Sequence, residues 1–251
     1  MSLQTKFDKF RQAIEPTENE REKVITSHTH LRQNILQKLT YVKNTILTGS
    51  YKRKTIIRPM NDVDVFVVLN YQPGAYGNPT PQSVLNRLKQ DLTATYPNTT
   101  IKQDKPCVIL DFSHCKFELT PAIEGNTWGA NYYEIPNSTN LNYWQRVDNP
   151  DIMGEQLTQA NRNNPMLIPL IKMMKRCKQQ NKLTKPRSFE MELLAIRQLG
   201  YITNYRDGVT RLLEIYGWLG WSDLQKIRMM SEDAFGDYCR NSLFGNDFPA
   251  Y

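Results

Sequence analysis

The feature that most constrains the fold lies between residues 47 and 69, where a Gly-Ser pair is followed, after eleven residues, by Asp-Val-Asp-Val-Phe-Val-Val-Leu. The apolar run that ends this stretch is typical of a buried strand. Alternate residues of a strand share a face, so we expect Asp62 and Asp64 to project together while the intervening valines enter a core. Adjacent carboxylates repel unless a cation lies between them, and Mg²⁺ binds one or two carboxylates together with substrate phosphates. The stretch therefore predicts a divalent-metal site.

A third acidic candidate comes from a predicted hairpin. Residues 107–112 and 115–120 are strand-like runs, and Pro121 is expected to end the second. The apolar residues on either side of Glu118 share the core side, so Glu118 faces the other way. It is a candidate for the face that carries Asp62 and Asp64, although an amphipathic strand can also carry an ordinary exposed glutamate there.

The rest of the chain predicts mostly helices. Thr17 and Glu20 form a capping-box pattern before a helix expected over residues 17–40. The other predicted segments are a loop over 71–81, a helix over 83–95, a crossing between two lobes over 122–164 and an all-helical region over 165–250. We therefore expect two domains, residues 1–160 and 161–251, in an α+β fold.

Positive charge is concentrated in the predicted helical region. The chain has a formal net charge of +7, and residues 172–187 contain seven basic residues and no acidic one. Such a run predicts an anionic partner such as nucleotide, nucleic acid or a membrane surface, and a solvated face explains it equally well. Ser188 is placed to cap the next helix, and a helix N-terminus also binds anions.

Cysteine usage and hydropathy bear on the compartment. Cys107, Cys115, Cys177 and Cys239 form no metal-binding pattern with the three histidines, and reduced thiols fit a cytoplasmic protein. The N-terminus has no apolar signal region, and no apolar stretch approaches eighteen residues. The sequence therefore predicts a soluble, cytoplasmic protein that does not enter a membrane.

Taken together, the Gly-Ser turn, the Asp-Val-Asp strand and a later strand carboxylate resemble the signature of the DNA polymerase β-type nucleotidyltransferases. Two motifs are similar to those of the bacterial CD-NTases, relatives of cyclic GMP-AMP synthase and oligoadenylate synthetase. They are Gly-Ser-Tyr-Lys-Arg-Lys-Thr-Ile-Ile-Arg-Pro at 49–59 and Phe-Glu-Leu-Thr-Pro-Ala at 117–122. These enzymes make nucleotide second messengers in CBASS anti-phage defence. The resemblance covers about residues 45–200, and it implies a polymerase β-like lobe with a mixed sheet, a C-terminal helical lobe and an active site in the cleft between them.

The resemblance also implies roles for individual residues. Asp62, Asp64 and Glu118 match the catalytic carboxylates, which hold two Mg²⁺ ions that Mn²⁺ can replace. Four residues match positions that contact the triphosphate of the nucleotide: Gly49, Ser50, Lys172 and Ser188. The implied substrates are nucleoside triphosphates, ATP or GTP, joined with release of pyrophosphate into a cyclic di- or trinucleotide. A regulatory partner protein and a downstream effector that binds the product are further implications.

Two alternatives stay open at the level of sequence. The first is a toxin-like nucleotidyltransferase that modifies an RNA 3′ end or a protein, and the second is a catalytically inactive binder, which would gain nothing from three clustered carboxylates. The chain departs from the resembled family in lacking a clear Asp-Pro segment near its C-terminus. The zinc insertion of the animal DNA sensor is also absent, so a nucleic-acid activator is not implied.

Overall fold

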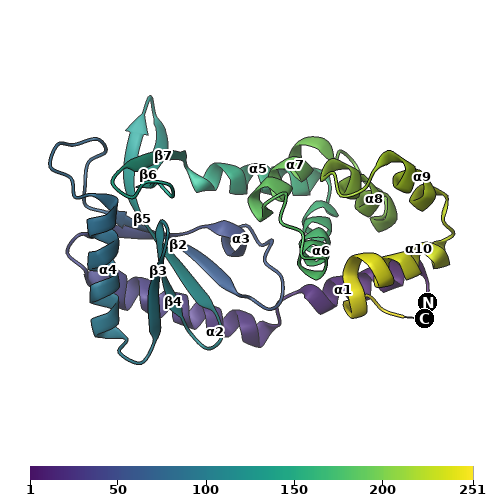
Figure 1. Cartoon of the computed structure of the whole chain (residues 1–251), viewed down its shortest axis with the longest axis horizontal. Helices are drawn as coiled ribbons and strands as arrows, with labels where there is room; N and C mark the ends of the chain where they lie inside the picture. The colour runs from purple at the N-terminus through teal and green to yellow at the C-terminus, as the bar shows by residue number, and fades with distance from the viewer. Residues whose placement is uncertain (251) are drawn as a thin grey trace. The chain divides into compact units, whose positions relative to one another are not determined.

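The doubly acidic stretch forms strand β2 (Asp62–Leu69) inside a mixed sheet, as seen in the computed structural model, which describes residues 1–250 (Figure 1). The strand order is β1-β2-β5-β4-β3, and β6 and β7 continue from β5. The other strands are β1 (Val42–Leu47), β3 (Thr100–Asp104), β4 (Cys107–Asp111), β5 (Lys116–Thr127), β6 (Ala130–Pro136) and β7 (Trp144–Asp148). β2 pairs in parallel with β5, whereas the other pairs are antiparallel. The predicted α+β fold with a mixed sheet is confirmed.

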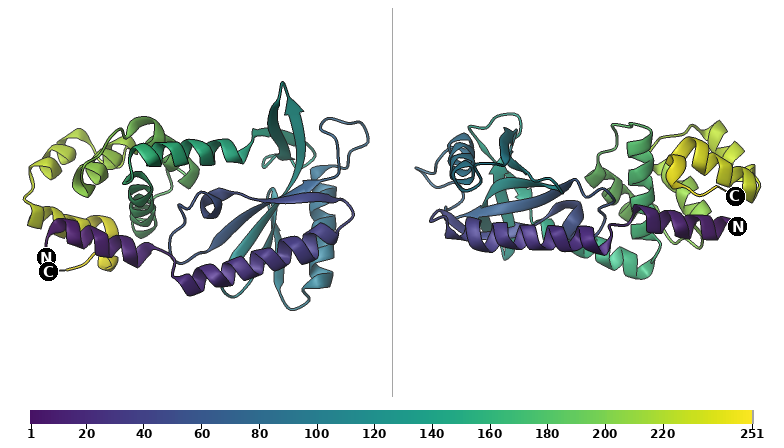
Figure 2. Two further views of the ribbon diagram at one scale, coloured as in Figure 1. Left: turned by 180° about the vertical axis from the view of Figure 1, so that it is seen from behind. Right: turned by 90° about the horizontal axis from the view of Figure 1, so that it is seen from below.

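The predicted alternation along β2 is present, because Val63 and Val65 are fully buried while Asp62 is exposed. Two helices pack against the sheet, α2 (Glu18–Thr29) and α4 (Pro81–Thr95), and Figure 2 shows α2 lying along one sheet face. Thr17 and Glu20 make the predicted reciprocal cap at the start of α2. The shorter helical elements here are η1 (His30–Ile35), η2 (Leu36–Lys38) and α3 (Gly49–Lys52).

Two expectations about the later strands are wrong. Pro121 does not end the second strand of the hairpin, because β5 runs through it to Thr127. The antiparallel register with β4 stops at Leu119 and that with β6 starts at Ile123, so Pro121 lies where one edge of β5 changes partners, and no antiparallel pairing on that edge needs its N–H. The crossing between two lobes expected over residues 122–164 is also too long, since most of β5's second half, β6 and β7 lie there and the chain leaves the sheet unit only after residue 153.

By contacts, the chain divides into two compact units. The sheet unit comprises residues 17–53 and 59–153, and the helical unit comprises residues 1–16, 54–58 and those from 154 onward. These units differ from the two contiguous stretches, 1–160 and 161–251, that the sequence predicts. The difference arises because the first sixteen residues bury their apolar side chains among the C-terminal helices.

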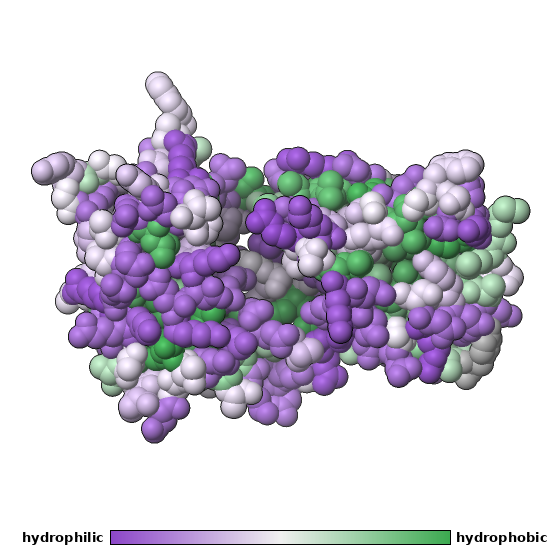
Figure 3. Space-filling model, viewed as in Figure 1, coloured by the Kyte–Doolittle hydropathy of each residue, from purple (hydrophilic) through white to green (hydrophobic). Residues whose placement is uncertain are grey.

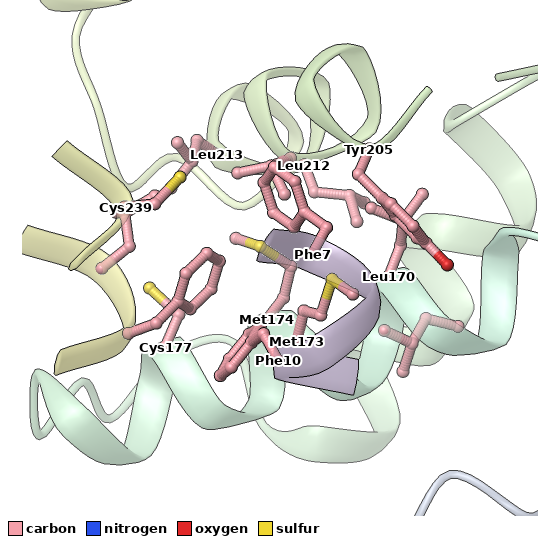
Figure 4. Close-up of a cluster of buried hydrophobic side chains, with 14 of the residues drawn as sticks. Phe7, Phe10, Leu170, Met173, Met174, Cys177, Tyr205, Leu212, Leu213 and Cys239 are labelled. Atoms are coloured by element: carbon pink, nitrogen blue, oxygen red, sulfur yellow. The ribbon is translucent and has the colours of Figure 1, made fainter. Parts of the chain in front are cut away.

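The helical unit confirms the all-helical prediction for the later chain. Its helices are α1 (Leu3–Ile14), α6 (Leu167–Gln180), α7 (Ser188–Gln198), α8 (Tyr205–Ile215), α9 (Trp221–Met229), α10 (Glu232–Tyr238), η3 (Cys239–Phe244) and η4 (Gly245–Asp247), and α5 (Pro150–Asn163) ends in this unit. Figure 4 shows Phe7 and Phe10 of α1 among Met173 and Met174 of α6 and side chains of α8 and η3. The rings of Phe10 and Phe244 lie 4.5 Å apart.

The surface seen in Figure 3 is largely hydrophilic, with only separate apolar patches, as expected when the large apolar side chains fill the cores. Within residues 1–250, no helix combines the length and the apolar character that a bilayer crossing requires.

Candidate active site

The parallel pairing of β2 and β5 brings the three candidate carboxylates onto one sheet face. Asp64 is the register partner of Glu118, and Asp62 is the partner of Lys116. Neighbouring strands lie about 4.8 Å apart, and register partners point to the same side. The sequence predicted that these acids share a face. The strand register adds that Asp64 and Glu118 are direct neighbours, which the sequence alone did not show.

The Gly-Ser turn lies directly against this acidic face. Gly49 begins α3 with a φ of +65°, a conformation that glycine adopts without strain. A Cβ atom placed on Gly49 would lie 1.7 Å from Oδ2 of Asp64. The preceding backbone N–H, that of Thr48, donates a hydrogen bond to the Asp64 carbonyl at 2.9 Å. The turn and the carboxylate strand therefore form one rigid piece in which only glycine fits.

Electrostatics on this face disfavour negative charge. Burial, reinforced by the neighbouring carboxylates of Asp64 and Asp62, raises the pKa of Glu118 to about 7. Desolvation also raises the pKa of Asp62, although the exposure of that side chain leaves much of the effect screened by solvent. Like charges held this close together attract either a proton or a cation.

Sequence reasoning missed two charged residues on the same face, Lys116 and Asp111. Lys116 lies between Asp62 on β2 and Asp111 on β4, since it is the register partner of both. Its ammonium group opposes the rise in the pKa of both Asp62 and Glu118. The signal was available in the sequence, because Lys116 lies two residues before Glu118 on a strand and must share its face.

The donor set fits a divalent cation. Carboxylate oxygens are the ligands that Mg²⁺ prefers, and the raised pKa of Glu118 shows that burial and the neighbouring carboxylates outweigh the opposing charge of Lys116. Among the side chains of residues 1–250, no three His, Cys, Asp or Glu groups are gathered closely enough to hold a metal ion as they stand. The metal assignment of Asp62, Asp64 and Glu118 therefore stays a prediction from residue type, register and charge.

The remaining predicted nucleotide contacts, Lys172 and Ser188, belong to the helical unit. Lys172 in α6 is almost fully buried, and its Nζ donates to both carboxylate oxygens of Glu15 at 2.7 Å. Ser188 is the first residue of α7, not its cap. Arg187 occupies the cap position, with its backbone N–H donating to the Glu190 side chain at 2.7 Å. The expected Ser188 cap is wrong, because this Arg187–Glu190 interaction replaces it.

The shifted pKa of Glu118 predicts how stability depends on pH in metal-free protein. The folded value of about 7 lies above the ordinary value of 4.5, so the folded state retains a proton that the unfolded state loses between these values. We expect the free energy of unfolding to fall as pH rises from about 4.5 to about 7. Urea titrations in EDTA at several pH values measure this.

Glu118→Gln is the control for that titration, because its amide cannot ionise. The stability of this variant is expected to lack the Glu118-dependent decline, so the difference between variant and wild type grows with pH. Parallel curves for the two proteins would contradict the assigned shift.

Comparisons with known proteins identify a family model, related sequences and related folds. Residues 1–161 match the family model described as the Second Messenger Oligonucleotide or Dinucleotide Synthetase domain. The chain is 28% identical over 230 residues to a cyclic AMP-AMP-AMP synthase from Acinetobacter sp. (strain ATCC 27244 / 9458), an alignment that covers 85% of this chain and 64% of the relative. The chain thus spans less than two thirds of that relative's length.

Solved structures share the fold at low sequence identity. CdnC from E. coli MS115-1, solved with ATP, superposes with a TM-score of 0.68 at 18% identity, covering 85% of this chain and 71% of CdnC. A complex of that protein with HORMA-deltaN gives 0.66, at 18% identity and coverages of 84% and 70%. The Bradyrhizobium diazoefficiens CD-NTase CdnG, solved with GTP, gives 0.69 at 11% identity, covering 85% and 75%.

Proposed function

The chain belongs to the Second Messenger Oligonucleotide or Dinucleotide Synthetase family, and from this membership we propose that it joins nucleoside triphosphates into a cyclic di- or trinucleotide second messenger, releasing pyrophosphate. The observation that carries the proposal is the register of Asp64 beside Glu118, with Gly49 packed directly against Asp64. A Gly-Ser turn and clustered strand carboxylates are the parts that phosphate positioning and metal binding require.

Asp62 and Asp64 would hold both divalent ions, and Glu118 would hold the ion beside the attacking ribose hydroxyl. Two such ions, when bound, lower the pKa of the attacking hydroxyl and stabilise charge on the pyrophosphate leaving group. Gly49 and Ser50 offer backbone and hydroxyl donors to the triphosphate, since the absent Cβ of Gly49 lets phosphate approach the main chain. The rigid contact between Gly49 and Asp64 would keep phosphate and metal ligands in fixed relation.

Lys172 and Ser188 complete the proposal as triphosphate contacts from the helical unit. Because the Lys172 ammonium group already binds Glu15, a phosphate would share that cation or replace the carboxylate. Ser188, at the first turn of an eleven-residue helix, offers a hydroxyl at the positive end of the helix dipole.

ATP and GTP are the proposed substrates, in keeping with the ATP and GTP named for the two structural relatives. The proposal extends to a cytoplasmic role in CBASS antiviral defence, with an effector that binds the product. A regulatory protein partner is included because CdnC was solved with HORMA-deltaN.

A product assay tests the function directly. Pure protein incubated with all four labelled nucleoside triphosphates and Mg²⁺ or Mn²⁺ is expected to yield a small labelled product that resists phosphatase, because a cyclic product has no terminal phosphate. Omitting the divalent ion or adding EDTA should remove it. Label found only on added RNA or on protein would instead identify a polymer-modifying transferase and overturn the proposal.

A further inference from the structure

A buried polar network in the helical unit contacts the chain between the Gly-Ser turn and the carboxylate strand. Residues 54–58 follow α3 and precede β2 in sequence, but they belong to the helical unit. Thr55 is fully buried, and Ile57, 5% exposed, is part of that unit's apolar core. The site's two main elements are therefore joined by a segment that the helices hold.

The network joins Thr55 to one side chain from each of two helices. Nζ of Lys175, on α6, donates to Oε1 of Glu192 at 2.7 Å, to Oγ1 of Thr55 at 2.9 Å and to the Thr55 carbonyl at 3.2 Å. The Thr55 hydroxyl donates to the same Glu192 oxygen, on α7, at 2.6 Å. The three donors of the ammonium group thus have acceptors, and both charges are compensated.

The far end of the segment is also tied through its backbone. The N–H of Arg58 donates to the Ile14 carbonyl at 2.9 Å, and Nη2 of Arg176 donates to the Arg58 carbonyl at 2.7 Å. Three of these contacts involve main-chain atoms, so they fix the path of the backbone whatever side chains it carries.

Stability alone does not require such a network. The side chain of Lys175 is 7% exposed and that of Glu192 is 0% exposed. Burying an ion pair costs several kcal/mol in desolvation, and apolar residues of similar size often serve a core as well. This buried ion pair also binds the backbone of residues 54–58, so its effect is to fix the position of that segment.

The connections from this segment to the site are short. Thr55 lies five positions after Ser50, a reach of at most about 18 Å, and Asp62 lies four positions after Arg58, at most about 14 Å. We propose that Lys175, Glu192 and Thr55 are positioning residues that hold residues 54–58 and thereby restrain the chain on either side of this segment, which leads to the Gly-Ser turn and to the strand carboxylates, during nucleotide joining. The inference rests on the proposed function.

The test uses Lys175→Met/Glu192→Leu, which replaces the ion pair with apolar side chains of similar size. This double variant leaves no buried charge unpaired, so we expect it to fold with a melting temperature close to the wild-type value. We expect kcat for nucleotide joining to fall about 100-fold, since small misplacements of reacting groups have effects of that size. KM for the nucleoside triphosphate should change less than about threefold.

The matched control is Lys226→Met/Asp223→Leu, which removes an exposed Lys–Asp pair on α9. It should leave kcat unchanged. Thr55→Ser retains the hydroxyl and should keep more of the rate than Thr55→Val, which loses it. A folded Lys175→Met/Glu192→Leu variant with the wild-type kcat would overturn the inference.

Hydrogen exchange measures how firmly residues 54–58 are held, and it does not depend on enzymatic activity. Peptides that cover residues 54–58 should exchange at least about tenfold faster in Lys175→Met/Glu192→Leu than in the wild type, while core peptides of α6 keep their protection. If the wild-type protein makes no product, the proposed function fails, whereas the exchange result still shows whether Lys175 and Glu192 hold residues 54–58. Unchanged protection of residues 54–58 in the folded double variant overturns the inference.

Discussion

Asp64→Asn is expected to lower the rate of product formation about 1,000-fold or more while the protein stays folded. Asparagine has the shape of aspartate but no charge, so it would remove the proposed carboxylate ligand of the divalent ions while preserving the packing against Gly49. Because the Asp64 carboxylate contributes to the raised pKa of Glu118, the substitution should also move that pKa down. The rate comes from the labelled product assay and the pKa from NMR titration of metal-free protein.

Glu124→Gln is the matched control for this substitution. Glu124 is a carboxylate on the same strand as Glu118, six residues further along and thus about 20 Å away, and it pairs with Lys43. Its neutralisation should leave the rate near the wild-type value. Full activity in Asp64→Asn, or in Asp62→Asn/Asp64→Asn, would remove the basis of the metal assignment.

Gly49→Ala is expected to reduce the rate about 100-fold or more through geometry alone. The added methyl group would meet Oδ2 of Asp64 at 1.7 Å and Cγ at 2.5 Å, so the carboxylate or the turn must move. The positive φ of Gly49 adds backbone strain. Steady-state kinetics over a range of Mg²⁺ concentrations should show that saturating metal does not restore the rate.

Gly74→Ala separates the two causes. Gly74 has a φ of +66°, nearly that of Gly49, but a Cβ at this position meets no atom within 4 Å. Gly74→Ala therefore carries the strain without the clash, and we expect it to lower stability slightly and leave the rate unchanged. Equal losses of rate in the two variants would show that contact with Asp64 is not the cause.

Local patterns predicted the sheet part of the site well. Period-two alternation places Asp62 and Asp64 on one face whatever the sheet order, and the same rule orients Glu118. The neighbour relation between Asp64 and Glu118 depends on the parallel pairing of β2 and β5, which local periodicity does not encode. A resemblance to known sequences was needed to connect the strands.

Long-range packing explains most of what the sequence did not predict. Lys175 looks like a member of a polar helix face, yet it is buried, because Glu192 and Thr55 come from segments 17 and 120 residues away. Strands β6 and β7 were missed because their alternation is weak and turn-forming residues surround them. The burial of a lysine and the pairing of a weak strand both depend on residues distant in sequence, which local propensity cannot identify.

The aromatic cluster of the helical unit sets an order of events during synthesis. The ring of Phe10 packs against that of Phe244, so two of the unit's central rings lie 234 positions apart in the sequence. A ribosome adds about 5–20 residues per second, which leaves α1 without its partners for many seconds after it emerges. Contacts of such high sequence separation form late because loop closure must be overcome first. The helical unit, which also holds residues 54–58, can therefore complete its core only after the chain has been made as far as Phe244 and Phe248.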